Sequence, residues 1–102
     1  MERFETTGAD GFFDVVGGTD RSQAATMTLA PGESTGGPRN AHDASDQWLY
    51  VVSGTGTATI EGQRYEIRTG TLLLVEAGET HEIANRGDRP LETINVYAPP
   101  EY

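Results

Sequence analysis

Short runs rich in Val, Ile, Thr, Tyr and Leu alternate along this chain with turn clusters built around glycine. Helical periodicity extends nowhere for long, and short apolar runs between closely spaced turns are typical of an all-β sandwich or barrel. Glu61-Gly62 is predicted to be a two-residue hairpin turn, and Ser53-Gly54-Thr55-Gly56 a longer one. The predicted strands are 12–16, 23–29, 39–42, 47–53, 56–60, 63–67, 71–76, 81–85 and 91–98.

The chain's two histidines each lie in a strand-like run between turns. His42 ends the segment Asn40-Ala41-His42, Gln47 opens the next apolar run, and His81 opens a later one. Side chains two apart on a strand point to the same side, so Asn40 and His42 can converge on one point. Nitrogen and oxygen donors from three predicted strands can therefore meet inside a closed sheet, which is the outline of a metal site.

These two segments resemble the two motifs of the cupin superfamily. The first cupin motif runs from a glycine through His-x-His and a glutamate to a second glycine, and the corresponding residues here are Gly37, Asn40, His42, Gln47 and Gly54. The second contains Pro-x-Gly, a histidine and an asparagine, which correspond to Glu76-Ala77-Gly78, His81 and Asn85. The resemblance implies the cupin double-stranded β-helix, a jelly-roll barrel, with the span 1–102 as a single cupin domain.

One subgroup of small cupins gives a more specific resemblance. The pair Asp46-Gln47 and the ending Pro99-Pro100-Glu101 are similar to the small cupins described as mannose-6-phosphate isomerase-like. The glutamine is therefore interpreted as native to the subgroup. The superfamily includes isomerases, epimerases, dioxygenases, storage proteins and sensors, so the resemblance is specific for the fold and much less so for the reaction.

The motif positions imply a divalent metal held by His42, Gln47 and His81, with Asn40 as the fourth ligand. Asn40 could equally cap the loop after Pro38 through its side chain. Mixed nitrogen and oxygen donors without thiolate suit Mn, Fe, Ni, Co or Zn. Neutral ligands would leave the full charge of the ion available to an oxygen of a polar or anionic ligand. The neighbouring carboxylates are interpreted as surface charges rather than ligands: Asp43, Asp46, Glu76 and Glu82.

Several functions remain open at this point. A metal-assisted sugar isomerase-type activity fits the subgroup, with the ion polarising a carbonyl or hydroxyl oxygen of the substrate. The absence of a clear interior acid or base favours a non-catalytic sensor or small-molecule binding module. A metal-dependent dioxygenase is a weaker alternative, because such sites normally add a carboxylate to two histidines. A structural cupin with an empty site is the remaining alternative.

Charge and patterning set expectations about partners. A net charge of −9 argues against nucleic acid or an anionic membrane as a partner, since phosphates would be repelled. The N-terminal residues contain no apolar stretch typical of a signal peptide, and no segment has the roughly 18 apolar residues of a membrane helix, so a cytoplasmic location is the default expectation. A small-molecule ligand is expected instead.

A homodimer is also expected. If Gln47 faces the interior, strand alternation places Leu49 and Val51 inside with it and turns Trp48, Tyr50 and Val52 outward. An outward patch with tryptophan and tyrosine is costly to leave exposed on so small a chain. Small cupins pair through such sheet faces, so the resemblance implies that a second copy covers it.

Overall fold

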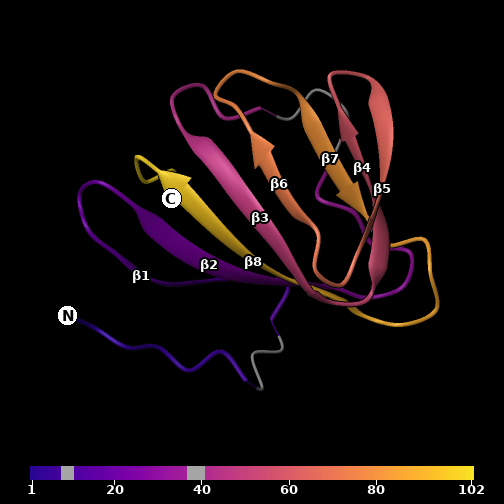
Figure 1. Cartoon of the computed structure of the whole chain (residues 1–102), viewed down its shortest axis with the longest axis horizontal. Coiled ribbons are helices and arrows are strands. Elements are labelled where there is room, and N and C mark those ends of the chain that lie inside the picture. Colours follow the sequence, from indigo (N-terminus) through magenta and orange to yellow (C-terminus); the bar gives the residue numbers. More distant parts are fainter. Residues whose placement is uncertain (8–10, 37–40) are drawn as a thin grey trace.

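The computed structural model describes residues 1–7, 11–36 and 41–102 and confirms the all-β prediction (Figure 1). Within these residues, eight strands form two sheets, and every paired neighbour is antiparallel. The strands are β1 (Phe13–Gly18), β2 (Gln23–Leu29), β3 (Asp46–Ser53), β4 (Thr55–Ile60), β5 (Gln63–Arg68), β6 (Leu72–Val75), β7 (His81–Ala84) and β8 (Leu91–Ala98).

The order of strands brings distant parts of the sequence together. The larger sheet runs β1-β2-β8-β3-β6, and the smaller runs β5-β4-β7. Figure 1 shows the smaller sheet beside the β6 side of the larger one. Strand β8 lies between β2 and β3, so the C-terminal strand is central to the larger sheet. Its last residues therefore lie beside the beginning of β3, where Gln47 pairs with Tyr97.

Strand β3 follows the predicted alternation. Gln47, Leu49 and Val51 are buried, whereas Trp48, Tyr50 and Val52 are exposed. Leu49 and Val51 belong to the hydrophobic core, which lies between the two sheets and draws residues from six strands. Its buried members are Met27, Leu29, Leu49, Val51, Ala58, Ile67, Ile83 and Leu91.

Two predicted turns differ in their outcome. Glu61 and Gly62 connect β4 to β5 with φ angles of 50° and 80°, the two positive values that a tight type I′ turn requires. The longer turn predicted over residues 53–56 is wrong, because Gly54 alone separates β3 from β4. Its φ is 98°, and an added Cβ would lie 2.4 Å from the carbonyl oxygen of Pro90. Glycine fits this position because it has no Cβ and tolerates a positive φ. The chain therefore crosses from β3 in the larger sheet to β4 in the smaller sheet through this one residue.

The predicted strand over residues 39–42 is also wrong where the structure describes it. Ala41 makes one isolated bridge with Thr80, and His42 lies outside the strands. A single pair is too short for a ladder, so the segment is held by individual contacts instead. One of these is the hydrogen bond from the Gly78 amide to the His42 carbonyl oxygen, at 2.7 Å. Arg39 and Asn40 lie outside the described residues.

The part of the chain that the structure describes contains no helix long and apolar enough to span a bilayer.

Candidate metal site

A cavity of about 200 Å³ opens at the end of the barrel where β3 begins and β8 ends. Both histidines and Gln47 line it, as the sequence predicts. Its described lining comes from five strands, the connecting loops and the C-terminal tail, and comprises Phe12, Phe13, Met27, Thr35, His42, Gln47, His81, Ile83, Tyr97 and Tyr102. The cavity therefore combines both histidines and Gln47 with a wall made largely of aromatic and aliphatic side chains.

The two imidazole rings are neighbours inside the barrel. Their centroids lie 4.7 Å apart with 45° between the ring planes, and both side chains are buried. His42 comes from the loop before β3, and His81 is the first residue of β7 in the other sheet. The bridge between Ala41 and Thr80 ties these two segments together one residue before each histidine. This contact explains how residues so far apart in sequence come to share one site.

Each imidazole is oriented by an oxygen on its outer side. His42 Nδ1 lies 2.9 Å from Glu101 Oε1, and His81 Nδ1 lies 3.3 Å from the carbonyl oxygen of Glu79. When each Nδ1 donates its proton to that oxygen, each Nε2 is left with a free lone pair. A histidine that binds a metal through one nitrogen is commonly held in this way through the other. In this tautomer, each of the two histidines could ligate a metal through Nε2.

Gln47 completes the group of donors. Its Oε1 lies 3.1 Å from His42 Nε2, and its Nε2 donates to Asn95 Oδ1 at 3.4 Å. With His42 protonated on Nδ1, a lone pair of nitrogen then faces a lone pair of oxygen, an arrangement that a shared cation would stabilise. Two ligands at right angles on a metal with bonds of about 2.1 Å lie about 3 Å apart. The donor set thus fits a metal ion at this corner of the cavity.

Burial also keeps His81 in the form that a metal needs. It lowers the pKa of His81 below the ordinary value of 6.5, and the nearby His42 acts in the same direction, while the Glu79 carbonyl opposes them. Desolvation disfavours the charged imidazolium, so the ring is neutral at neutral pH. No proton therefore has to leave His81 before it can donate a lone pair.

The outcome for the other predicted site residues is mixed. Asn40 lies outside the described residues, so its proposed role as fourth ligand stays a prediction. Asp43, Asp46 and Glu76 are exposed and Glu82 is half-buried. Within residues 1–7, 11–36 and 41–102, no group of three or more His, Asp or Glu side chains is placed to hold an ion. A metal bound here would therefore need the amide of Gln47 as its third donor.

Sequence reasoning missed the C-terminal tail. Glu101 reaches His42, and Ser45 holds the tail by donating its hydroxyl to the Pro99 carbonyl oxygen at 2.7 Å. Gln23 and the backbone of Tyr102 form a reciprocal pair, with the Gln23 amide donating at 2.7 Å and the Tyr102 amide donating at 2.9 Å. The Pro-Pro-Glu ending was the available signal, but it identified a subgroup and gave no role to the carboxylate.

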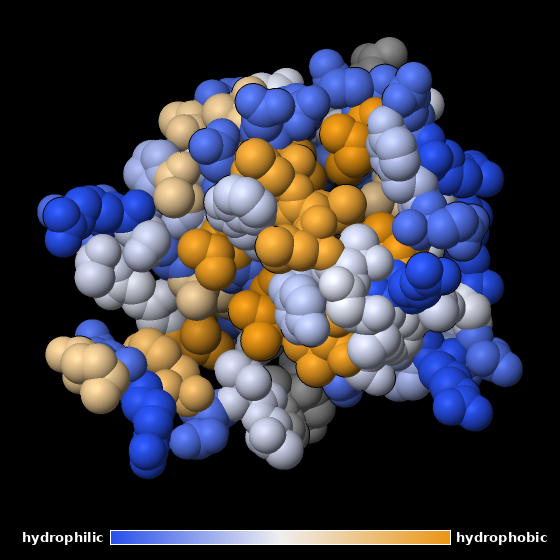
Figure 2. All heavy atoms as spheres, viewed as in Figure 1, coloured by the Kyte–Doolittle hydropathy of each residue, from blue (hydrophilic) through white to orange (hydrophobic). Residues whose placement is uncertain are grey.

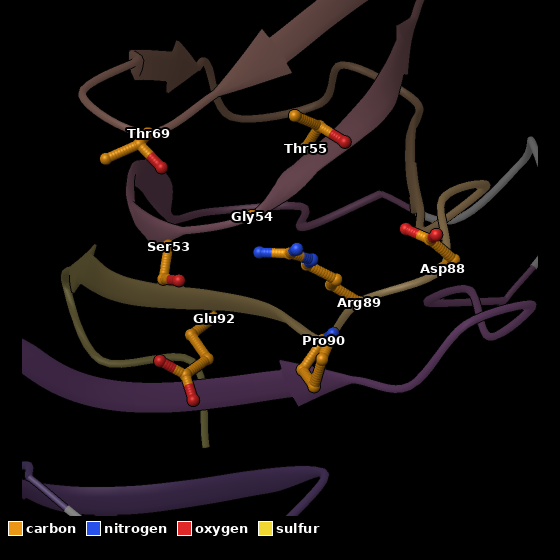
Figure 3. Close-up of a pocket in the computed structure, with 8 residues that line it drawn as sticks. All are labelled: Ser53, Gly54, Thr55, Thr69, Asp88, Arg89, Pro90 and Glu92. Atoms are coloured by element: carbon orange, nitrogen blue, oxygen red, sulfur yellow. The ribbon is translucent and has the colours of Figure 1, made fainter.

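A second hollow lies at the other end of β3 and β8, and Figure 3 shows its lining. The Arg89 side chain extends into it toward Ser53 and Gly54. Asp88 and Glu92 also line it, so its single cation is offset by two carboxylates. All of its lining residues except Gly54 are exposed. The described lining of the second hollow therefore has no buried polar side chain that could orient a ligand. The histidine-lined cavity is the candidate site for this reason.

Comparison with known proteins identifies the family. The sequence matches the family described as Cupin_2, the cupin domain, over residues 25–97. The chain is a cupin. The matched span includes His42, Gln47, His81 and the strands that carry the core, and it ends at Tyr97, before Glu101 and Tyr102.

Relatives of this cupin are named for different functions. It is 33% identical over 86 residues to the mannose-1-phosphate guanylyltransferase of Escherichia coli, which covers 84% of this chain and 18% of that protein. It is 32% identical over 72 residues to the oxalate-binding protein of Thermotoga maritima, covering 71% of this chain and 58% of that one. The cupin thus spans less than two thirds of either relative.

Solved structures confirm the predicted double-stranded β-helix. One is a Klebsiella pneumoniae protein described as having a double-stranded β-helix domain, which superposes with a TM-score of 0.79 at 21% identity over 91% of this chain and 80% of that one. The cupin superposes on a crystal structure from Bacillus halodurans with a TM-score of 0.89 and 28% sequence identity. The superposition covers 95% of this chain and 76% of the other. The architecture is therefore shared along nearly the whole chain, including strands β1 and β2, which precede all of the motif residues.

Proposed function

We propose that this cupin binds a divalent transition metal through His42, Gln47 and His81 and presents it to a small ligand in the cavity. The observation that carries the proposal is the orientation of both imidazoles, whose Nδ1 atoms each face an oxygen on the outer side. The metal would act as a Lewis acid toward an oxygen of the ligand. Asn40 is proposed as a further donor.

A binding module is favoured over an enzyme by the lining of the cavity. Among the described lining residues there is no carboxylate that could act as a general base or complete an iron site of the dioxygenase type. Glu101 is near, but its carboxylate faces Nδ1 on the outer side of His42. The isomerase-type activity implied by the subgroup would need its proton transfer from His42, His81 or a tyrosine. The oxalate-binding relative supports a non-catalytic role for a cupin of this kind.

The hydrogen bonds of the site also allow a metal-free alternative. Asn95 Nδ2 is buried without a partner. If the amides of Gln47 and Asn95 were both turned over, Asn95 would donate to Gln47, and Gln47 would donate to His42 Nε2. That arrangement would give Asn95 Nδ2 and His42 Nε2 partners without a cation, would leave Asn95 Oδ1 in the place that lacks one, and would make the site purely structural.

Metal titration separates these alternatives. We expect metal-free protein, prepared with chelator, to gain thermal stability on addition of Mn²⁺, Fe²⁺, Co²⁺, Ni²⁺ or Zn²⁺, because an ion that binds only the folded state stabilises it. At about 100 times the dissociation constant the gain is about 2.7 kcal/mol. Differential scanning calorimetry with each ion measures it, and Mg²⁺ serves as a control ion that prefers oxygen ligands. No stabilisation by any of the five ions would support the metal-free site.

We further propose that a second copy of the chain covers the outer face of the larger sheet. Figure 2 shows hydrophobic residues gathered near the centre of the face in view, over β3, β6 and β8. Five exposed side chains from β3 and β6 form the outer patch, each 42–58% exposed: Trp48, Tyr50, Val52, Leu72 and Leu74. Trp48 pairs with Leu74 and Tyr50 with Leu72, so the patch is continuous. These side chains are uncharged, and two copies carrying −9 each would meet most favourably there.

Replacing Leu72 with glutamate should separate the copies. Leu72 is 58% exposed, so the substitution leaves the core intact while placing a charge in the outer patch. We expect Leu72→Glu to shift the protein from dimer to monomer in light scattering coupled to size exclusion. Tyr65→Glu is the control, since Tyr65 is exposed on β5 in the other sheet. A wild-type monomer at millimolar concentration, or a variant that stays dimeric, would contradict the proposal.

A further inference from the structure

The wall of the histidine-lined cavity is mostly apolar. Six of its ten described lining residues are aromatic or aliphatic, and four of these are aromatic: Phe12, Phe13, Tyr97 and Tyr102. The remaining polar residues are Thr35 and the three proposed ligands. Such a wall favours a ligand that is itself largely apolar, with one polar group directed toward the histidines.

The charges around the cavity disfavour a phosphorylated sugar. None of its described lining residues is Arg, Lys, Asp or Glu. A phosphate monoester carries a charge of about −1.5 to −2 at neutral pH, and only a bound ion, with no cationic side chain beside it, would offset that charge on burial. A sugar ring would also bring several hydroxyls, each of which loses water on entering the cavity. Thr35 and the imidazoles offer too few partners to replace those hydrogen bonds.

The aromatic side chains present ring faces and edges at close range. Tyr97 and Tyr102 are 5.2 Å apart at 80°, and Phe13 and Tyr102 are 4.8 Å apart at 56°. Tyr97 also packs edge-on to His42 at 5.3 Å. Offset and edge-to-face contacts of this kind stabilise an added aromatic ring beyond its buried area. The same wall would contact a saturated ring only through its shape.

The size of the cavity sets the size of the ligand. Its volume is about 200 Å³, and an apolar cavity of about 150 Å³ is large enough to hold benzene. One substituted six-membered ring therefore fits. In the metal-free protein, the free Nε2 lone pair of either histidine accepts a hydrogen bond from a hydroxyl on that ring. An ion held by both histidines would instead bind the oxygen of that hydroxyl. A phenol meets both requirements, and it is neutral at neutral pH because its pKa lies near that of tyrosine, about 10.

We infer that the cavity binds a single-ring phenol, with its ring against Phe13, Tyr97 and Tyr102 and its hydroxyl directed toward the end of the cavity where His42 and His81 lie. The inference rests on the proposed function for the place of the hydroxyl, at the metal-binding end of the cavity. The position proposed for the phenol ring rests on the aromatic wall alone. Tyr102 determines specificity in this arrangement, because it closes the side of the cavity formed by the tail.

A matched pair of probes tests the inference. Isothermal titration is carried out with 4-methylphenol and with 4-methylcyclohexanol, which has the same hydroxyl and methyl groups on a saturated ring. We expect the phenol to bind at least tenfold more tightly. We expect Tyr102→Ala to weaken it at least fivefold and Tyr65→Ala, which removes an exposed tyrosine outside the cavity, to leave it unchanged. Equal affinity for the two probes, or binding of glucose 6-phosphate in place of the phenol, would overturn the inference.

Metal content measured on the same samples separates the two proposals. If the protein holds a metal but does not bind the phenol, the ligand class is wrong and the proposed metal binding stands. If the phenol binds with the expected selectivity after the metal has been removed with chelator, the ligand class is supported whatever the outcome of metal titration. Loss of phenol binding in Tyr102→Ala is interpreted only alongside an unchanged melting temperature, which excludes unfolding as the cause.

Discussion

His42→Ala combined with His81→Ala should abolish stoichiometric metal binding while leaving the barrel folded. Both rings lie in one cavity with their Nδ1 atoms held by oxygens on the outer side, so the variant removes both nitrogen donors. The amides of Gln47 and Asn40 would remain, and these neutral oxygen donors would not hold a transition metal by themselves. Elemental analysis after metal loading and desalting measures the loss.

The fold should survive because the histidines are not part of the hydrophobic core. That core is aliphatic and lies deeper between the sheets, around Leu49, Val51 and Ile83. Burial lowers the pKa of His81, which shows that its surroundings disfavour the charged ring, so replacing it removes that cost at acidic pH. We therefore expect the metal-free double variant to unfold cooperatively, with β-sheet circular dichroism like that of the wild type.

A pair of glutamine variants provides the matched control for this prediction. Gln47→Ala should weaken metal binding without abolishing it, because both imidazoles remain. Gln63→Ala should change nothing, since Gln63 is exposed at the start of β5, where its side chain accepts from the Tyr65 hydroxyl. Retention of one metal ion per chain by the double histidine variant would show that the ligands lie elsewhere.

Much of the architecture could be predicted because β-structure leaves a periodic signal. The alternation from Gln47 to Val52 determines which side chains enter the barrel, and the structure confirms it residue by residue. The same periodicity places Gln47 on the face of β3 that lines the cavity. His81 follows similarly, as the first residue of β7. These predictions need only the local pattern and the knowledge that the sheet closes.

The remainder of the site depends on contacts that have no local pattern. His42 was expected on a strand, but it is held by the bridge at Ala41 and by its own carbonyl oxygen. Glu101 lies 59 residues further along the chain, in a segment outside the strands, so alternation says nothing about its direction. The aromatic wall depends on how β1 and the tail pack over β8. Such packing follows from the register of the whole sheet rather than from any one segment.

Removing the Glu101 carboxylate should weaken metal binding by about 10–100-fold, the range typical of residues that orient a metal-binding histidine. Glu101 holds His42 Nδ1 at 2.9 Å and is itself near the Ser45 hydroxyl, at 3.4 Å. Glu101→Gln keeps an oxygen acceptor but loses the charge, so its effect should lie near the lower limit. Glu101→Ala also loses the acceptor, so its loss of metal affinity should approach the upper limit of that range. Isothermal titration with the ion that stabilises the wild type most strongly measures both.

A second measurement distinguishes positioning from a general effect on the fold. The ring-nitrogen chemical shifts of His42 report which nitrogen carries the proton, and we expect Nδ1–H in the metal-free wild type. Glu101→Ala should lose that preference, because the outer acceptor that fixes it is absent. His81 should keep its own state, since the oxygen of Glu79 that faces it is unchanged.

Glu76→Gln is the matched control for charge. Glu76 is an exposed carboxylate close to the segment that leads to His81, and its removal changes the net charge by the same amount as Glu101→Gln. If the two variants weakened metal binding equally, Glu101 would act only through the general negative potential of this acidic chain. A selective effect of Glu101 would instead place part of the site in the C-terminal tail, which lies beyond the span that matches the cupin domain. Members of the family with different tails could then tune one barrel to different metal affinities without any change in the ligands.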